Sequence, residues 1–257
     1  MRILMLGDVT ALCGVRYLQE KLWQFRREKK IDFVSVNAEN ASFIGGADQA
    51  AAEALLSAGA DVLTGGNHTM QTHSVHTYLE HSDRMLRPLN YPAAVPGCGY
   101  TVLDAMGYRV LVLNAMGTVH MEPTLDNPFT AIERVLERME GHYDFGILDF
   151  HAEATGEKYA IGHYFDGKIQ IIVGTHTHVP TADEQILPKG SGYVSDLGMC
   201  GPSGGILGIK SEVIMHRCRL HLPMHYEVAE GAPVAQGVIF TLNTDSCRVT
   251  DVERITF

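Results

Sequence analysis

Residues 145–151 read Phe-Gly-Ile-Leu-Asp-Phe-His, an apolar run that leads into a histidine. Short apolar runs also lead into polar side chains at four other places in the chain. Uninterrupted runs of this kind are typical of strands in a sheet that is covered on both faces. The five runs, each with the polar residues that follow it, are 3–6 with Gly7-Asp8, 33–36 with Glu39-Asn40, 62–63 with Asn67-His68, 145–148 with His151, and 171–173 with His176-Thr177-His178.

We expect the polar residues that follow these runs to lie together in the folded protein. In an open α/β sheet, ligands bind in the crevice at the carboxyl ends of the strands. Side chains scattered between residues 8 and 178 can therefore meet at one end of the sheet. This convergence is the main indication of function in the sequence.

The segments between and after the runs predict an α/β protein. Apolar residues recur with helical spacing over 15–30, and a Met-Gly pair at 106–107 indicates the turn of a hairpin over 100–114. The prediction is a single domain over 1–257, with two mixed sheets face to face and helices outside. The other expected helices cover about 48–57, 128–139 and 153–163, and the other expected strands cover 61–63, 226–228, 234–242 and 249–255.

Composition narrows the functional class. The chain has 257 residues and a formal net charge of −10, which disfavours binding to long duplex nucleic acid but not to a small nucleotide. It contains no run of about 18 apolar residues and no signal-peptide pattern, so we expect a soluble, cytoplasmic protein that does not enter a membrane. The five cysteines include no Cys-x-x-Cys pair, which predicts reduced thiols rather than disulfides or a thiolate zinc site.

The polar residues form a ligand set for two metal ions. A pair of metals about 3.5–4 Å apart needs a bridging carboxylate, neutral imidazoles and an open position for water or substrate. Nitrogen and oxygen ligands without thiolate suit manganese, iron or zinc, and do not suit an all-oxygen calcium site. If 176–178 is extended, its two histidines point to the same side. The candidate ligands are the carboxylates of Asp8 and Glu39, the amides of Asn40 and Asn67, and the imidazoles of His151, His176 and His178.

His68 has a different expected role. It follows Asn67 in the sequence Gly-Gly-Asn-His at 65–68, where the glycines allow the backbone to turn tightly at the end of a strand. A histidine that titrates near neutrality can protonate the alkoxide that leaves a phosphate ester. His68 is therefore the candidate general acid.

Each polar group also has an ordinary structural explanation. Asp8 could cap a helix or belong to a turn, and Glu39-Asn40 could lie in a solvated loop. A single histidine such as His151 is more often a hydrogen-bonded structural residue than a ligand. We favour the metal site because five such groups coincide at predicted strand ends.

The glycine-rich segment from Gly198 to Gly205 leaves two interpretations open. Its backbone amides could lie near a ligand oxygen, or it could be a flexible loop across the mouth of the site. It lacks the Lys-Ser/Thr that ends a P-loop, so binding of a nucleoside triphosphate is not supported.

The blocks around these residues resemble the calcineurin-like metallophosphoesterases, and more closely their YmdB-type branch. The likeness runs from residue 1 to about 255. It implies a four-layer α/β/β/α sandwich and a phosphodiesterase that acts on cyclic nucleotides, with 2′,3′-cyclic and 3′,5′-cyclic monophosphates both in range. It also implies a homo-oligomer. The matching blocks are Gly7-Asp8-Val9, Asn37-Ala38-Glu39-Asn40-Ala41, Gly66-Asn67-His68-Thr69, 149–155, 174–179 and 196–202.

The resemblance further implies roles for single residues. His68 corresponds to the catalytic histidine of the family. The wider superfamily has Asp-x-His where this chain has Asp8-Val9-Thr10, and Asn40 is the branch's usual substitute for the missing ligand. The branch's first loop commonly carries Pro-Gly-Arg, whereas 12–16 reads Leu-Cys-Gly-Val-Arg, so no substrate contact is carried over to that loop. The implied ligands are Asp8, Glu39, Asn40 and His178 for one metal, and Glu39, Asn67, His151 and His176 for the other, with Glu39 bridging.

Our hypothesis from the sequence is a dinuclear metal-dependent phosphodiesterase. A hydroxide that bridges two ions of iron or manganese, with zinc as an alternative, attacks phosphorus, and His68 protonates the leaving oxygen. A phosphomonoesterase or a nuclease with the same metals is the alternative among enzymes. The alternative from another class is a metal-containing regulatory protein that binds a nucleotide with little turnover.

Overall fold

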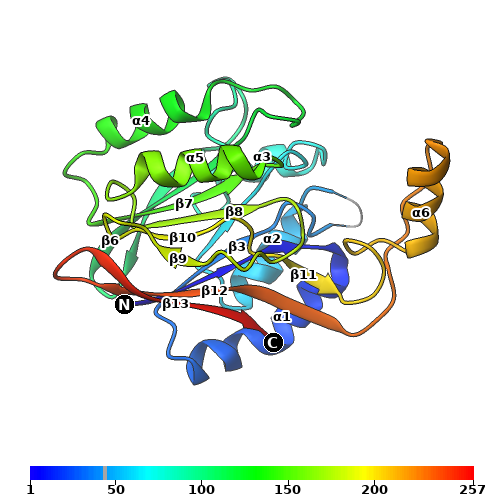
Figure 1. Ribbon diagram of the computed structural model, residues 1–257, viewed down its shortest axis with the longest axis horizontal. Coiled ribbons are helices and arrows are strands. Elements are labelled where there is room, and N and C mark those ends of the chain that lie inside the picture. The colour runs from blue at the N-terminus through cyan, green and yellow to red at the C-terminus, as the bar shows by residue number, and fades with distance from the viewer. Residues whose placement is uncertain (43–44) are drawn as a thin grey trace.

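Two β-sheets pack face to face and carry helices on their outer sides, which gives four layers in the order α/β/β/α (Figure 1). The computed structural model describes residues 1–42 and 45–257. The strands of the first sheet are β1 (Arg2–Leu6), β2 (Asp8–Val9), β3 (Phe33–Asn37), β4 (Val62–Thr64), β11 (Met199–Pro202), β12 (Pro233–Asn243) and β13 (Arg248–Thr256). The strands of the second sheet are β5 (Tyr100–Ala105), β6 (Tyr108–Met116), β7 (Phe145–His151), β8 (Ile171–Thr175), β9 (Gln185–Ile186) and β10 (Gly192–Val194).

The helices cover the outer faces of the sheets. In Figure 1, α4 and α5 lie over the second sheet, and α1 lies against the first. None of the helices in residues 1–42 and 45–257 is long and apolar enough to cross a membrane. The helices are α1 (Ala11–Glu28), α2 (Gln49–Ser57), α3 (Val75–His81), α4 (Pro128–Arg138), α5 (Thr155–Phe165) and α6 (Ser211–Leu220).

Both sheets contain parallel and antiparallel pairs. In the first sheet, β1 is parallel to β3 and β3 is parallel to β4, whereas β12 runs antiparallel to β1. In the second, β6, β7 and β8 are parallel and β5 is antiparallel to β6. The prediction of an α/β fold with two mixed sheets is therefore confirmed. The candidate polar residues singled out in the sequence lie at the carboxyl ends of the parallel strands.

Apolar side chains on both faces of each sheet form three clusters. Ile3 and Met5 of β1 belong to the cluster between the sheets, and Leu4 and Leu6 belong to the cluster under α1 and α2. A third cluster, which includes Leu148 of β7, packs against α4 and α5. Because successive side chains of a strand point to opposite faces, a strand between two apolar layers must be apolar throughout. This explains the uninterrupted runs in the sequence.

The C-terminal half departs most from the prediction. Met199–Pro202 is strand β11 and not a loop: it pairs in parallel with β2 and antiparallel with β12. Residues 226–228, which we expected to form a strand, contribute only an isolated bridge between Val228 and Ile209. Helix α6 has no counterpart in the prediction, and neither has α3 in the N-terminal half. The conformation of Met199–Pro202 depends on pairing with strands that are far away in the sequence.

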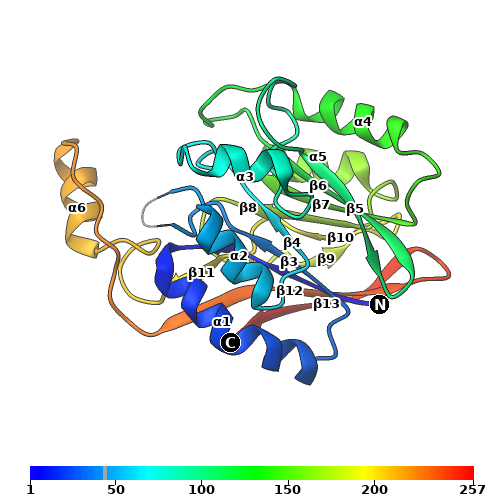
Figure 2. The ribbon, with the colours of Figure 1, turned by 180° about the vertical axis from the view of Figure 1, so that it is seen from behind.

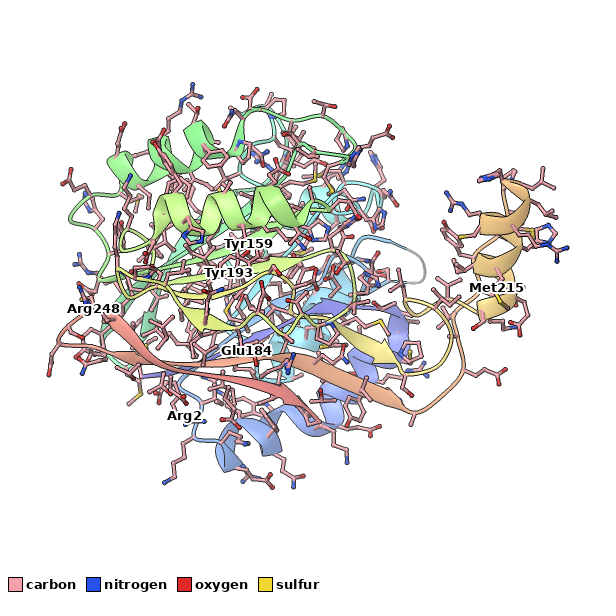
Figure 3. All side chains as sticks on the ribbon, viewed as in Figure 1. Arg2, Tyr159, Glu184, Tyr193, Met215 and Arg248 are labelled. Atoms are coloured by element: carbon pink, nitrogen blue, oxygen red, sulfur yellow. The ribbon has the colours of Figure 1, made fainter. Side chains whose placement is uncertain are left out.

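Helix α6 projects from the body of the molecule (Figure 2). Of its ten residues, all of them described, only Val213 is buried. Met215, labelled in Figure 3, is 55% exposed, and Leu220 at the end of the helix is 48% exposed. The helix and the segments that lead to and from it form an arm beside the site described below.

A buried ion pair connects the outer helix α5 to the segment after β10. Lys158 Nζ lies 2.8 Å from Asp196 Oδ2, and the side chains are only 3% and 1% exposed. The same carboxylate accepts hydrogen bonds from the backbone amides of Thr177 and Gly198 at 3.0 and 2.9 Å. Asp196 therefore holds the loop that carries two of the candidate histidines.

Replacing Lys158 with Met should lower the free energy of unfolding by about 3–5 kcal/mol, because the buried carboxylate of Asp196 would lose its cation. Chemical denaturation followed by circular dichroism measures this change. Lys210→Met is the matched control, since the Lys210–Glu227 pair is exposed and its loss should have far less effect. Equal effects of the two substitutions would contradict the structural role of the buried pair.

Candidate metal centre

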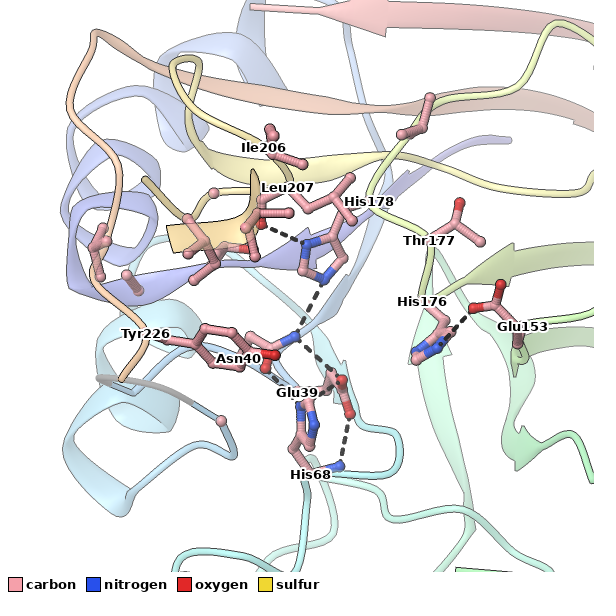
Figure 4. A pocket seen from close by; sticks show the side chains of 18 of the residues that line it. Glu39, Asn40, His68, Glu153, His176, Thr177, His178, Ile206, Leu207 and Tyr226 are labelled. Carbon is pink, nitrogen blue, oxygen red and sulfur yellow. Dashed lines mark hydrogen bonds and ion pairs between the residues drawn. The ribbon is translucent and has the colours of Figure 1, made fainter. Parts of the chain in front are cut away.

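The residues that the sequence singled out come together at the carboxyl ends of β1, β3, β4, β7 and β8. They adjoin a cavity of about 690 Å³ (Figure 4). Asp8 and His151 lie behind the cavity wall in contact with lining residues, and Asn67 contacts His151. The candidates that line the cavity are Glu39, Asn40, His68, His176 and His178.

The first group of candidate ligands surrounds His151, which is fully buried at the end of β7. Its Nε2 lies 3.0 Å from Asn67 Oδ1, 3.1 Å from His176 Nδ1 and 3.4 Å from Glu39 Oε1. The ligand atoms of Glu39, His151 and His176 are all within 4.8 Å of one another. Nitrogen and oxygen donors thus converge on one point, as a metal site requires.

The second group surrounds His178. Its Nε2 lies 3.2 Å from Asn40 Nδ2 and 3.8 Å from Asp8 Oδ1. Asn40 Nδ2 is also 3.2 Å from Glu39 Oε1, so Glu39 lies between the two groups and contacts a member of each. That is the position a bridging carboxylate would occupy.

The Asn40 amide turns its nitrogen toward His178 and Glu39, and its oxygen lies 2.8 Å from His68 Nδ1. A metal ligand must present the oxygen. A half-turn of the planar amide exchanges the two atoms without moving the backbone, and this would bring the carbonyl oxygen to the ligand side.

Glycine is required at positions 66 and 7, because other atoms of the chain lie too close to the backbone there to leave room for a side chain. A Cβ at Gly66 would collide with His151 Nε2 and with Glu39 Oε2. A Cβ at Gly7 would collide with the carbonyl oxygen of Gly198. Any side chain at Gly66 would therefore displace candidate ligands, and one at Gly7 would separate β11 from the strand end that carries Asp8.

Each of the three histidines has its outer ring nitrogen beside a hydrogen-bond acceptor. An N–H that donates outward leaves the other nitrogen of the ring unprotonated and directed at the centre, which is the form that binds a metal. The pairs are His151 Nδ1 with Thr175 Oγ1 at 2.9 Å, His176 Nε2 with Glu153 Oε2 at 3.1 Å, and His178 Nδ1 with the carbonyl oxygen of Leu207 at 3.2 Å.

The acceptor for His151 belongs to a buried polar network. Thr175 Oγ1 donates to Asp149 Oδ1 at 2.7 Å, so its oxygen is left to accept the N–H of His151. Asp149 also accepts hydrogen bonds from the Asn37 amide and the Thr64 hydroxyl, which come from strands of the opposite sheet. Burial raises the pKa of Asp149. The network orients His151 and joins the two sheets directly behind it.

Burial and mutual charge shift the pKa values of the candidate ligands. Burial alone would lower the pKa of His151, but the charges of Glu39 and Asp8 outweigh it and raise the pKa to about 9. Burial would likewise raise the pKa of Glu39, yet the interaction with His151 holds it well below its usual range. Burial raises the pKa of Asp8 to about 6, and burial together with the His151 charge lowers that of His176 to about 3. The carboxylates thus stabilise a positive charge at the centre.

A metal ion fits this environment. Asp8 Oδ1 is buried and has no hydrogen-bond partner among the described residues. A buried carboxylate oxygen without a partner is costly, and a cation beside it would remove that cost. A cation would also replace the proton that the carboxylates otherwise hold on His151.

His68 lies beside the second group. Its backbone amide donates to Glu39 Oε2 at 2.9 Å, and its ring Nδ1 is 3.0 Å from Glu39 Oε1. The side chain is 33% exposed, so the ring reaches the cavity where a substrate would bind. The geometry thus brings His68 to the cavity, and its role as an acid remains a prediction.

Residues 176–178 are not extended, so the condition under which strand alternation would point both histidines to one side is not met. Strand β8 ends at Thr175, and both His176 and His178 have left-handed backbones with φ of 104° and 62°. Both side chains still reach the centre, because the loop is held by a hydrogen bond from the His176 amide to Asp8 Oδ2 at 3.1 Å and by Asp196. The left-handed backbone at both histidines, and not strand alternation, therefore directs the two rings.

The glycine-rich segment does not line the cavity. The described residues that line the cavity include none between 198 and 205, and residues 206–209 line it instead. Part of the segment is built into the first sheet as β11. Its glycines serve backbone packing next to the site.

Sequence reasoning missed the residues that hold the histidines. Asp149 carries a detectable signal, because a carboxylate inside the apolar run 145–151 must find partners when buried. Thr175 gives a weaker signal of the same kind at the end of β8. The carbonyl of Leu207 could not be recognised from the sequence, since every residue has a backbone oxygen.

Comparison with known proteins gives matches over the whole chain. The family model described as YmdB-like protein matches residues 4–255. A 2′,3′-cyclic-nucleotide 2′-phosphodiesterase from Bacillus subtilis (strain 168) is 38% identical over 255 residues, covering 99% of this chain and 96% of that protein.

Solved structures agree with these sequence matches. A crystal structure of a hypothetical protein from Thermus thermophilus has a TM-score of 0.93 at 36% identity, covering 100% of this chain and 99% of that one. A phosphatase from Mycoplasma pneumoniae also has a TM-score of 0.93, at 33% identity, covering 100% of this chain and 93% of that one. The four-layer fold and the enzymatic character of the relatives agree with the resemblance seen in the sequence. This chain belongs to the YmdB-like protein family.

Proposed function

We propose that this chain is a two-metal phosphodiesterase that hydrolyses cyclic nucleotides. The observation that carries the proposal is the position of Glu39, whose carboxylate contacts both groups of candidate ligands at the cavity. The relative from Bacillus subtilis, named for its action on 2′,3′-cyclic nucleotides, supports the choice of substrate class. The same substrates and the 3′,5′-cyclic monophosphates are proposed for this chain.

The donor set supports two ions of iron or manganese, with zinc as the alternative. When bound, such ions supply Lewis acidity and lower the pKa of a coordinated water. The outer hydrogen bonds of His151, His176 and His178 would direct their inner ring nitrogens toward the ions. The residues that would hold the ions are Asp8, Glu39, Asn40 and His178 at one position, and Glu39, Asn67, His151 and His176 at the other.

His68 is the proposed general acid. Its Nδ1 faces Glu39 Oε1, so Nε2 is the nitrogen free to transfer a proton. Water oxygen forms a new bond to phosphorus as one P–O bond of the cyclic diester breaks, and the released alkoxide takes the proton from Nε2. The attacking water loses a proton to solvent, and solvent returns a proton to His68. The carboxylate of Glu39, 3.0 Å from Nδ1, holds the ring in place.

We also propose that the protein is cytoplasmic and forms a homo-oligomer. Support for an assembly comes from α6, which projects from the body and buries only Val213 within the chain. Its exposed Met215 and Leu220 are apolar surface of the kind that subunit interfaces cover.

Manganese- or iron-loaded protein should hydrolyse 2′,3′-cyclic and 3′,5′-cyclic nucleotides and bis-p-nitrophenyl phosphate, and should hydrolyse phosphate monoesters far more slowly. Release of product measured by chromatography or absorbance tests this, with chelator-treated protein as the control. A preference for monoesters would favour the phosphomonoesterase. Tight nucleotide binding without hydrolysis would favour a regulatory protein.

His68→Ala should slow turnover of cyclic nucleotides about 100-fold or more, the usual contribution of a general acid, while metal content stays near two ions per chain. Steady-state kinetics and elemental analysis on the same preparation provide the two readouts. His142→Ala, which changes an exposed histidine that does not line the cavity, is the control and should behave as wild type. Loss of metal from His68→Ala would instead identify His68 as a ligand.

Thr175→Val should weaken manganese binding by roughly 10- to 100-fold, because His151 loses the acceptor that orients its ring. Competition with a metal chelator measures the affinity without relying on activity. Thr175→Ser keeps the hydroxyl and should retain nearly wild-type affinity. Equal affinities of the Val and Ser variants would show that the network with Asp149 is not needed to hold His151.

A further inference from the structure

The cavity beside the candidate ligands has two chemically different sides. One side carries the carboxylate, amide and imidazole groups described above. The other, here called the apolar wall, consists of Ile206, Leu207, Ile209, Ile214, Tyr226 and Val228. Phosphoryl transfer needs only the polar side. The apolar wall is therefore available to recognise another part of a substrate.

The apolar wall is attached directly to the candidate metal centre. The carbonyl oxygen of Leu207 accepts the hydrogen bond from His178 Nδ1 at 3.2 Å. Ile209 forms isolated bridges with Ile206 and with Val228, which join the two segments of the wall. One small molecule whose phosphate lies at the candidate metal centre could therefore also contact the apolar wall.

Tyr226 presents an aromatic ring to this cavity, and no phenylalanine, tryptophan or other tyrosine is among the described lining residues. Figure 4 labels the ring among the side chains that line the cavity. The guanidinium carbon of Arg217 lies 5.3 Å from the centre of the ring. Arg217 lines a neighbouring hollow with Tyr226 but does not line this cavity, so its contact with the ring leaves the cavity open to a ligand.

Leu207 adds to the case for a ligand at the wall. It is 46% exposed although it stands next to a candidate metal ligand, and Val179 at the same cavity is 53% exposed. Apolar side chains held open beside a polar centre favour a ligand that has an apolar face joined to an anionic group. A nucleotide has this build, since its base is flat and aromatic and its phosphate is anionic.

We propose that the apolar wall, with Tyr226 as its central contact, binds the nucleobase of the substrate. This inference rests on the proposed function and adds the site for the base. The volume of about 690 Å³ lies within the usual range for small-molecule pockets. Stacking on an aromatic ring tolerates any base, so purine and pyrimidine nucleotides should both bind.

Two substrates test the proposal: adenosine 2′,3′-cyclic phosphate, and glycerol 1,2-cyclic phosphate, which has the same five-membered cyclic diester but no base. Steady-state kinetics on manganese-loaded protein would compare wild type with Tyr226→Ala and Tyr226→Phe. Tyr226→Ala should raise KM for the nucleotide about tenfold and change kcat little, the loss expected from one stacking contact. KM for the glycerol compound should not change, and Tyr226→Phe should resemble wild type.

Tyr164→Ala, which removes an exposed tyrosine on α5 away from the cavity, is the matched control and should leave both KM values unchanged. Equal rises in KM for both substrates, or no rise for the nucleotide, would overturn the base site while leaving the phosphodiesterase in place. If wild type cleaves neither substrate, the proposed function fails. Calorimetry with adenosine 2′-monophosphate and adenosine 3′-monophosphate then decides the base site by itself, because Tyr226→Ala must weaken binding for the site to stand.

Discussion

The buried carboxylate of Asp149 connects the two sheets at the point where the candidate ligands meet. It accepts hydrogen bonds from Thr175 within its own sheet and from Asn37 and Thr64 of the opposite sheet. The packing of apolar faces brings two sheets together, but it does not define the position of one sheet along the other. A polar network whose members must all be satisfied permits one alignment only. That alignment brings the end of β7, with His151, to the end of β3, which leads to Glu39.

The second constraint is electrostatic. The centre gathers two buried carboxylates, Asp8 and Glu39, and no lysine or arginine is among the described residues that line its cavity. The positive charge that balances them within the chain is held by histidine, and the raised pKa of His151 expresses this. Metal ions would take over that role and bring the Lewis acidity needed for phosphoryl transfer. A scarcity of basic side chains is thus consistent with the chemistry proposed.

Two different parts of the chain supply the polar side and the apolar side of the cavity. The polar groups come from strand ends within the first 178 residues, and the apolar wall comes from the segment between Ile206 and Val228. The hydrogen bond between His178 Nδ1 and the carbonyl oxygen of Leu207 connects these two parts of the chain. Such a division allows the wall to differ between relatives while the strand ends stay the same, so substrate preference can change without loss of the metal centre.

From the sequence we could predict the α/β class, the buried strands β1, β3, β4, β7 and β8, and the polar residues that follow them. This succeeded because burial on both faces forces continuous apolar runs, and because polar groups placed right after such runs must lie at strand ends. The tertiary structure alone decided that Met199–Pro202 is a strand, that His176 and His178 reach the centre from left-handed turns, and that Thr175, Glu153 and the Leu207 carbonyl orient the imidazoles. These features depend on partners remote in the chain, and local sequence patterns do not record which distant backbone a segment will meet.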